Sequence, residues 1–165
     1  MATKFHKISE YQWMKAIPEG VSGFIWEETY DDIIIPKRKT RHSSGYDFHA
    51  PYAFALEPGE VMLVETGIKI ELEPNQELLL FPRSSSGFKY FLRLANTIGK
   101  VDSDYFNNSD NEGHIFIKIR NEGNKTMEID KGQAFAQGTI YEYQITDDDS
   151  FDYGDIRKGG IGSTD

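Results

Sequence analysis

The expected fold rests on residues 61–81, which read VMLVETGIKIELEPNQELLLF. Within them Ile68, Ile70 and Leu72 alternate with charged side chains, which is the period of a half-buried β-strand. A Pro-Asn turn follows, and residues 78–81 then form an apolar run that is typical of a buried strand. The segment therefore predicts consecutive antiparallel strands joined by short turns.

Similar strand-like runs recur on both sides of this segment. They are short, rich in β-branched and aromatic residues, and separated by turn residues. They fall at residues 21–27, 32–35, 115–120, 127–129 and 134–142. Helical signals are confined to residues 9–17, with Ser9 as the expected N-cap, and to residues 84–90.

Together these runs predict an all-β chain, a jelly-roll-like antiparallel β-barrel with one short helix. Long helical patterns do not alternate with the strands, which disfavours a doubly wound α/β fold. We expect residues 1–146 to form the barrel domain, with residues 1–31 as an N-terminal extension of undefined role. Residues 147–165 are first acidic and then glycine-rich, which predicts a flexible C-terminal arm.

Composition excludes several classes of function. The chain has 165 residues, a usual size for one domain, and a net charge of −9. This charge disfavours binding to nucleic acid or to an anionic membrane. The chain has no cysteine, which excludes disulfides, thiolate metal sites and a cysteine nucleophile. No apolar run is long enough to span a membrane and no signal peptide is apparent, so the expected location is the cytoplasm.

Residues 82–86, PRSSS, come directly after a buried strand and begin the second helical segment. Arg83 offers a forked donor, and the hydroxyls of Ser84 and Ser85 lie next to the free N–H groups of a helix start. This chemistry suits a phosphate. Taken alone, however, such a stretch is more often a helix cap beside a surface arginine.

Residues 96–105, NTIGKVDSDY, bring an amide, carboxylates and an aromatic ring together. Asn96 can read an amide-like ligand edge, Asp102 can take a proton from water, and Tyr105 can pack on a sugar. In a regular strand Asp102 and Tyr105 would point to opposite faces, so the backbone must turn between them if both serve one pocket. Taken alone, the stretch is more often an ordinary hairpin.

Two further stretches lie near the C-terminus. In residues 131–137, KGQAFAQ, the polar Gln137 stands in a mainly apolar run, and alone it would be a solvent-facing strand position. Residues 157–164, RKGGIGST, combine cationic side chains with exposed glycine N–H groups, which can close over phosphates. Alone, such a segment is most often a disordered polar tail.

Taken in order, these stretches resemble the five motifs of the trimeric all-β dUTP pyrophosphatases (dUTPases), which have a β-clip-like fold. The counterparts are residues 44–47 (SGYD), 82–85 (PRSS), 99–105 (GKVDSDY), 131–137 (KGQAFAQ) and 157–164 (RKGGIGST). The resemblance implies a hydrolase that cleaves dUTP between its α- and β-phosphates, giving dUMP and pyrophosphate.

The resemblance also implies roles at the nucleoside. Asp102 falls on the carboxylate that activates water, and Tyr105 on the ring that excludes a 2′-hydroxyl. Asn96 falls on a residue that helps to read uracil, in a hairpin that includes Gly99. Ile161 stands where the family usually has an aromatic residue, so aliphatic packing would replace stacking on uracil.

Other positions match contacts to the triphosphate. Arg83, Ser84 and Ser85 match phosphate-binding positions, and Arg157 matches the arginine for the γ-phosphate. Gln137 matches a contact to phosphate or to a metal-bound water, and Asp47 matches a carboxylate that supports the metal's water shell or the adjacent subunit contact. The stretch that wraps the phosphates corresponds to Gly160, Gly162, Ser163 and Thr164.

Charge agrees with a required Mg²⁺, because a triphosphate with about four negative charges meets a chain that is itself acidic. Phosphates and water would be its main ligands, with Asp47 and Gln137 reaching it only through water. The family builds each active site from three subunits: motifs one, two and four from one chain, three from another and five from a third. We therefore expect a homotrimer with shared active sites.

Other functions remain open at this stage. A dCTP deaminase of the same fold would need a catalytic glutamate and a pocket that accepts cytosine. A non-catalytic nucleotide-binding or signalling module could also use this fold, as could a structural jelly roll. The presence of all five motifs favours the dUTPase.

Overall fold

The computed structural model describes residues 3–17 and 26–160, and the strands in this part of the chain pair antiparallel throughout. In chain order the strands are β1 (Lys4–Lys7), β2 (Lys37–Arg38), β3 (Tyr46–His49), β4 (Phe54–Leu56), β5 (Val61–Glu65), β6 (Ile68–Glu71), β7 (Gln76–Pro82), β8 (Leu92–Leu94), β9 (Gly99–Asp102), β10 (Phe116–Asn121), β11 (Met127–Ile129) and β12 (Ala134–Glu142). The all-β prediction is confirmed.

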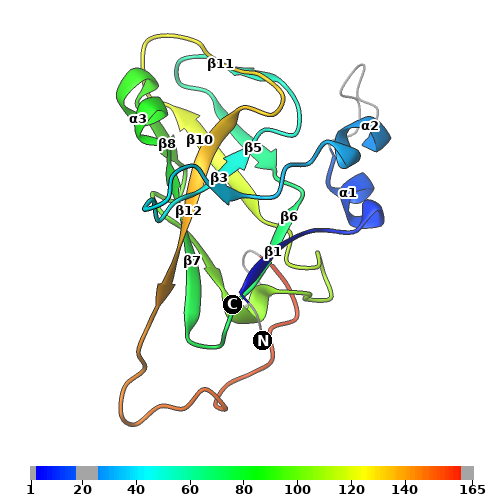
Figure 1. Cartoon of the computed structure of the whole chain (residues 1–165), viewed down its shortest axis with the longest axis vertical. Helices are drawn as coiled ribbons and strands as arrows, with labels where there is room; N and C mark the ends of the chain where they lie inside the picture. Colours follow the sequence, from blue (N-terminus) through cyan, green and yellow to red (C-terminus); the bar gives the residue numbers. More distant parts are fainter. Residues whose placement is uncertain (1–2, 18–25, 161–165) are drawn as a thin grey trace.

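The strands form one larger sheet and three smaller ones (Figure 1). The larger sheet has the order β2-β3-β12-β7-β9, and a three-stranded sheet has the order β5-β10-β8. Strands β1 and β6 form one pair, and β11 and β4 form another. Within the described residues these sheets stay open, so the closed barrel that the sequence suggested is not formed there.

Three helices are described rather than the single one expected: α1 (Glu10–Ala16), α2 (Trp26–Asp31) and α3 (Ser84–Tyr90), with a 3₁₀ turn η1 (Ser103–Tyr105). Helices α1 and α3 lie where the sequence showed helical signals. Helix α2 and the irregular segment after it correct the strands predicted at residues 26–27 and 32–35, while residues 21–25 lie outside the described residues. The reason is tertiary: the indole N–H of Trp13 in α1 donates to the hydroxyl of Thr29, which holds α2 against α1.

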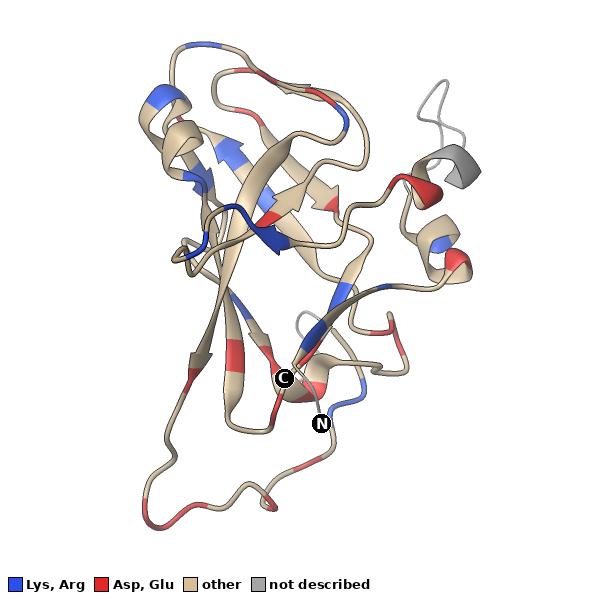
Figure 2. Cartoon of the chain, in the orientation of Figure 1, with Lys and Arg blue, Asp and Glu red and all other residues tan. Residues whose placement is uncertain are grey.

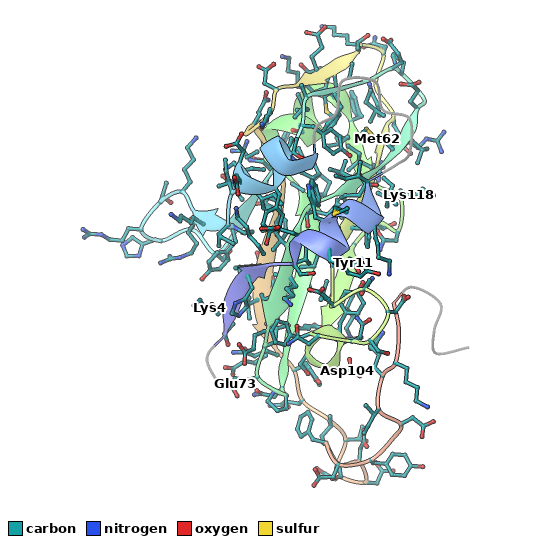
Figure 3. All side chains as sticks on the ribbon, turned by 90° about the vertical axis from the view of Figure 1, so that its right-hand side faces the viewer. Lys4, Tyr11, Met62, Glu73, Asp104 and Lys118 are labelled. Atoms are coloured by element: carbon teal, nitrogen blue, oxygen red, sulfur yellow. The ribbon has the colours of Figure 1, made fainter. Side chains whose placement is uncertain are left out.

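The alternating pattern read from the sequence corresponds to burial in the structure. In β10, Ile117 and Ile119 are buried, whereas Lys118 and Arg120, which alternate with them, are exposed. The N-terminal segment joins the same interior, because β1 pairs with β6 and Trp13 has no exposed surface. Tyr11, by contrast, lies on the outer side of α1 (Figure 3).

After β12 the chain runs without helix or strand through residues 143–160. It loops away from the sheets and then returns alongside η1 (Figure 1). Asp and Glu residues mark this arm, whereas Lys and Arg mark β2 and the loop after it (Figure 2). Among the described helices, none has the length and apolar character needed to cross a membrane.

Candidate active site

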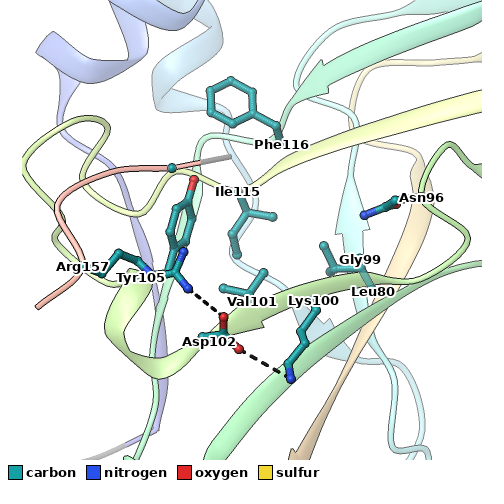
Figure 4. Close-up of a pocket in the computed structure, with 11 residues that line it drawn as sticks. Leu80, Asn96, Gly99, Lys100, Val101, Asp102, Tyr105, Ile115, Phe116 and Arg157 are labelled. Carbon is teal, nitrogen blue, oxygen red and sulfur yellow. Dashed lines mark hydrogen bonds and ion pairs between the residues drawn. The ribbon is translucent and has the colours of Figure 1, made fainter. Parts of the chain in front are cut away.

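A pocket of about 180 Å³ lies where β9 ends and the arm returns (Figure 4). Its walls come from β7, from β9 and the loop before it, from η1, from the start of β10 and from the arm. The predicted site residues that line it are Asn96, Gly99, Asp102, Tyr105, Arg157 and Gly160. Side chains separated by more than fifty positions in sequence therefore share one cavity.

Turn η1 allows Asp102 and Tyr105 to serve the same pocket. Asp102 ends β9 in extended conformation, with φ −80° and ψ 158°, and the following three residues turn as a 3₁₀ helix. In a continuing strand the two side chains would have pointed to opposite faces. The change of direction that the sequence required is therefore supplied by η1.

The carboxylate of Asp102 lies between two cationic side chains. Its Oδ2 accepts a hydrogen bond of 2.8 Å from Nη2 of Arg157, and its Oδ1 lies 3.7 Å from Nζ of Lys100. Nε of Arg157 also donates to Asp104, at 2.8 Å, so one guanidinium joins two carboxylates. Lys100 is held mainly by Glu77, whose hydrogen bond at 2.9 Å raises the pKa of the lysine despite partial burial.

Tyr105 forms a half-buried wall of the pocket. Its hydroxyl donates to the carbonyl of His114 at 2.9 Å and accepts from Nδ2 of Asn111 at 2.7 Å. Burial raises the pKa of Tyr105, with the charge of Asp110 acting in the same direction and Asn111 opposing it. The phenol therefore stays neutral at physiological pH, and its ring presents an apolar face.

Gly99 and Asn96 shape the opposite side. Gly99 pairs with Leu80 of β7, and a Cβ at this glycine would lie 2.9 Å from Cβ of Leu80. Only a glycine fits this close approach without a shift of the neighbouring strand. Asn96 is exposed in the turn before β9, where its carbonyl accepts from the N–H of Ile98 at 2.7 Å. Its side chain is thus presented to the pocket from a short, ordered turn.

A second group of predicted residues gathers at the other end of β7. Nε of Arg83 lies 3.2 Å from Oδ1 of Asp47, and its Nη1 donates to the carbonyl of Ala134. Gln137 lies opposite Asp47 in the pairing of β12 with β3, and its Nε2 donates to the carbonyl of Pro82 at 3.1 Å. Ser84 and Ser85 are exposed in the first turn of α3.

The two groups do not share a pocket within one chain. Asp47 and Arg83 line a separate hollow of about 420 Å³, next to the cationic residues of β2. Ile161, Gly162, Ser163 and Thr164 lie outside the described residues. Among the described residues no group of three or more His, Asp or Glu side chains is placed to hold a metal ion.

The sequence assigned no role to two residues at the site. Asp104 shares the guanidinium of Arg157, and Asn111 contacts the hydroxyl of Tyr105. Asn111 belongs to a loop rich in Asn and Asp, a composition that indicates only turns. A further sign was available, because several residues with amide or carboxylate side chains closely follow a predicted site tyrosine.

The sequence of the chain is similar to those of known proteins. Residues 31–165 match the protein-family model described as dUTPase. The deoxyuridine 5′-triphosphate nucleotidohydrolase of Lactococcus lactis subsp. lactis (strain IL1403) is 41% identical over 132 residues, covering 80% of this chain and 88% of the relative. The protein of the same name from Nautilia profundicola is 32% identical over 136 residues, covering 81% and 92%.

Solved structures show the same similarity. The crystal structure of dUTPase from Streptococcus mutans superposes with a TM-score of 0.67 and 31% identity, covering 87% of this chain and 98% of that one. A mutant dUTPase from phage phi11 of S. aureus, described with a structural Mg(II) ion, has a TM-score of 0.65, 18% identity and coverage of 91% and 96%. At that identity the phage protein supports the fold alone.

Proposed function

The chain belongs to the dUTPase family, and we propose that it hydrolyses dUTP to dUMP and pyrophosphate. The observation that carries this proposal is the pocket beside η1. This pocket is lined by the carboxylate of Asp102, by the aromatic ring of Tyr105 and by Arg157 from a distant part of the chain. A general base, a nucleoside surface and a phosphate partner are the elements this reaction needs.

Asp102 is the proposed general base. Its carboxylate accepts a proton from a water molecule, which then attacks the α-phosphorus in line with the bond to the leaving pyrophosphate. A position at the end of a strand and the start of a turn fixes the carboxylate while leaving it 40% exposed, so that water can reach it. The triphosphate would replace Asp102 and Asp104 as partner of Arg157.

The nucleoside is proposed to lie between Tyr105 and the loop before β9. Asn96 and the backbone around Gly99 would pair with the uracil edge, whose donor and acceptor pattern differs from that of cytosine. The ring of Tyr105 would pack on the deoxyribose and leave no space for a 2′-hydroxyl. Gly99 and Leu80 line the same pocket, and their close packing supports this by fixing the start of β9 against β7.

The phosphates would contact Arg83, Ser84 and Ser85, and the arm would close over them with Arg157 and residues 160–164. Mg²⁺ would neutralise the phosphate oxygens and polarise the reacting phosphorus. Asp47 and Gln137 fit a contact to its water shell, since they lie opposite each other on β3 and β12 and offer the oxygen donors that Mg²⁺ prefers. Two such residues are too few to form a complete metal site, which agrees with coordination mainly by substrate and water.

We further propose a homotrimer with shared sites. The separation of the Asp47–Arg83 group from the Asp102 pocket supports it, because a triphosphate bound at one group needs the other from a neighbouring copy. The proposed division of the chain is a β-domain of residues 1–146 and an arm of residues 147–165.

The decisive experiment measures pyrophosphate release from dUTP, dTTP, dCTP and UTP, with Mg²⁺ and with the metal chelated. We expect release from dUTP alone, and only with the metal present. Ammonia release from dCTP would instead identify a deaminase. Binding of dUTP without any turnover would favour a non-catalytic module.

A further inference from the structure

The loop of residues 106–113 lies in the connection from η1 to β10 and carries several hydrogen-bonding side chains toward Tyr105. Asn108 is nearly buried, with 7% of its surface exposed, and its Nδ2 donates to the carbonyl of Tyr105 at 2.8 Å. Gly113 closes the loop at φ +81°, and a Cβ there would lie 2.6 Å from the same carbonyl. The loop therefore packs tightly around the backbone of Tyr105.

The side chain of Tyr105 is held at its far end by the same loop. Its hydroxyl has one proton, which goes to the carbonyl of His114 at 2.9 Å. Nδ2 of Asn111 donates to the hydroxyl oxygen at 2.7 Å, so the hydroxyl both donates and accepts. These two hydrogen bonds fix the rotamer of Tyr105 and also how far its ring extends into the pocket.

Asn111 is itself held in place. Its Oδ1 accepts from Nδ2 of Asn108 at 2.9 Å and from the N–H of Gly113 at 3.1 Å, which assigns its amide group so that Nδ2 points to Tyr105. Oδ1 of Asn108 in turn accepts from the N–H of Asn111 at 3.0 Å. Asn111 therefore has a defined orientation before any ligand is bound.

The loop is also anchored to the rest of the chain. Oε2 of Glu112 accepts from the N–H of Ser9 at 3.0 Å and lies 3.3 Å from Nζ of Lys69. Burial acts against the charged form of Glu112, but the hydrogen bonds from Ser9 and Lys69 outweigh it and lower the pKa of this carboxyl. The N-terminal segment thus contacts the loop that holds Tyr105.

We propose that Asn111 is a positioning residue that sets the selectivity for deoxyribose over ribose by holding the Tyr105 ring against the sugar. This rests on the proposed function, in which Tyr105 packs on the deoxyribose. Without the amide of Asn111 the ring can tilt outward around the remaining hydrogen bond. A 2′-hydroxyl then finds space, and UTP becomes a better substrate relative to dUTP.

The test compares kcat/KM for dUTP with kcat/KM for UTP in wild type, Asn111→Ala, Tyr105→Phe and the double variant. Loss of one hydrogen bond predicts that the dUTP:UTP ratio falls roughly three- to tenfold in Asn111→Ala. Tyr105→Phe removes this hydrogen bond and also the one to the carbonyl of His114, so it should lower the ratio at least as much. If Asn111 acts through the hydroxyl of Tyr105, the dUTP:UTP ratio of the double variant should be no lower than that of Tyr105→Phe alone.

Asn107→Gly is the matched control. It deletes another amide of the same loop, at a position of φ +55° where glycine is tolerated, and this amide contacts Lys69 rather than Tyr105. Its ratio should equal that of wild type, whatever its melting temperature, because a general loss of stability affects both substrates alike.

Two results would overturn the inference: an unchanged ratio in Asn111→Ala, or effects that multiply in the double variant. Should Asn111→Ala fail to fold, an unchanged ratio in Tyr105→Phe alone would have the same meaning. A wild-type chain that releases no pyrophosphate from dUTP would refute the proposed function instead. The two failures are therefore distinguishable.

Discussion

Asp102 owes its position to the three residues that follow it. Because η1 turns directly after β9, the carboxylate sits at the rim of the pocket, with Tyr105 on the same side. Asp104 lies one residue inside the turn and shares the guanidinium of Arg157 with Asp102. A run of four residues thus provides both the proposed base and the resting partner of the arm's arginine.

Replacing Asp102 with Asn tests the proposed base directly. The change keeps the size and shape of the side chain but removes its ability to take a proton. We expect turnover of dUTP to fall by a factor of about 10²–10⁴, which is the usual contribution of a general base. Affinity for a non-hydrolysable dUTP analogue, measured by calorimetry, should stay within a few-fold. Unchanged turnover would contradict the assignment.

His114 should make the stability of the fold depend on pH. Burial lowers the pKa of His114 from 6.5 to about 3, although the charge of Glu112 opposes this. The unfolded chain therefore binds more protons between these values, and stability falls as the pH drops through this window. We expect a loss of about 2 kcal/mol between pH 7.5 and pH 5, measured by urea unfolding.

His114→Gln is the control for this prediction. Nε2 of His114 accepts from the N–H of Gly67, and the oxygen of glutamine can accept in its place without titrating. The variant should lose less stability than wild type over the same pH interval. Equal losses in both chains would assign the effect to other groups.

The elements differ in how well local sequence predicts them. Strand β10 was predictable because its alternation of buried and exposed side chains is a local property. Helix α2 was not, because the contact between Trp13 and Thr29 joins positions that no local pattern relates. The sheet order β2-β3-β12-β7-β9 depends on pairings across most of the chain, and short strands of similar composition do not specify their partners.

The residues of the site also differ in how well local sequence predicts them. Residues 96–105 are close in sequence, so their shared pocket followed from one turn. The role of Asn111 was hidden, since an asparagine in a loop has the same appearance whether it closes a turn or holds a neighbouring tyrosine. The resemblance of five motifs in order supplied what residue chemistry alone left open.

The arm is the element whose removal should separate activity from folding. At the end of the arm Lys158 is exposed, and Arg157 is bound chiefly by two partly exposed carboxylates. Deleting residues 157–165 should slow dUTP hydrolysis at least about tenfold, because phosphate contacts are lost, and leave the melting temperature within about 2 °C. A large drop in melting temperature would show that the arm is a structural part of the domain. Circular dichroism and a pyrophosphate assay provide both readouts.

At the scale of the whole molecule, the separation of two groups of site residues calls for assembly. The Asp102 pocket and the hollow beside Asp47 and Arg83 are distinct within one chain. Closed symmetric assembly can bring the first group of one copy to the second group of the next. Light scattering of the purified protein should give three times the mass of the chain.

Mixing two inactive variants tests whether neighbouring copies share a site. We expect Asp102→Asn and Arg83→Gln each to be nearly inactive. After joint refolding, random assembly of a cyclic trimer leaves both residues intact in one site out of four, so activity should recover to about a quarter of wild type. If each chain formed a complete site alone, the mixture would stay inactive. Each variant refolded separately is the control.

The N-terminal segment also bears on how the protein can be shortened. The match to the family model begins at residue 31, yet Phe5, Ile8 and Trp13 belong to the buried interior. A chain cut at the start of the family match would lose a wholly enclosed indole and uncover the edge of β6. The family-model match and the buried interior thus have different limits in this molecule, and a trimmed version prepared for crystallisation should retain everything from Lys4 onward.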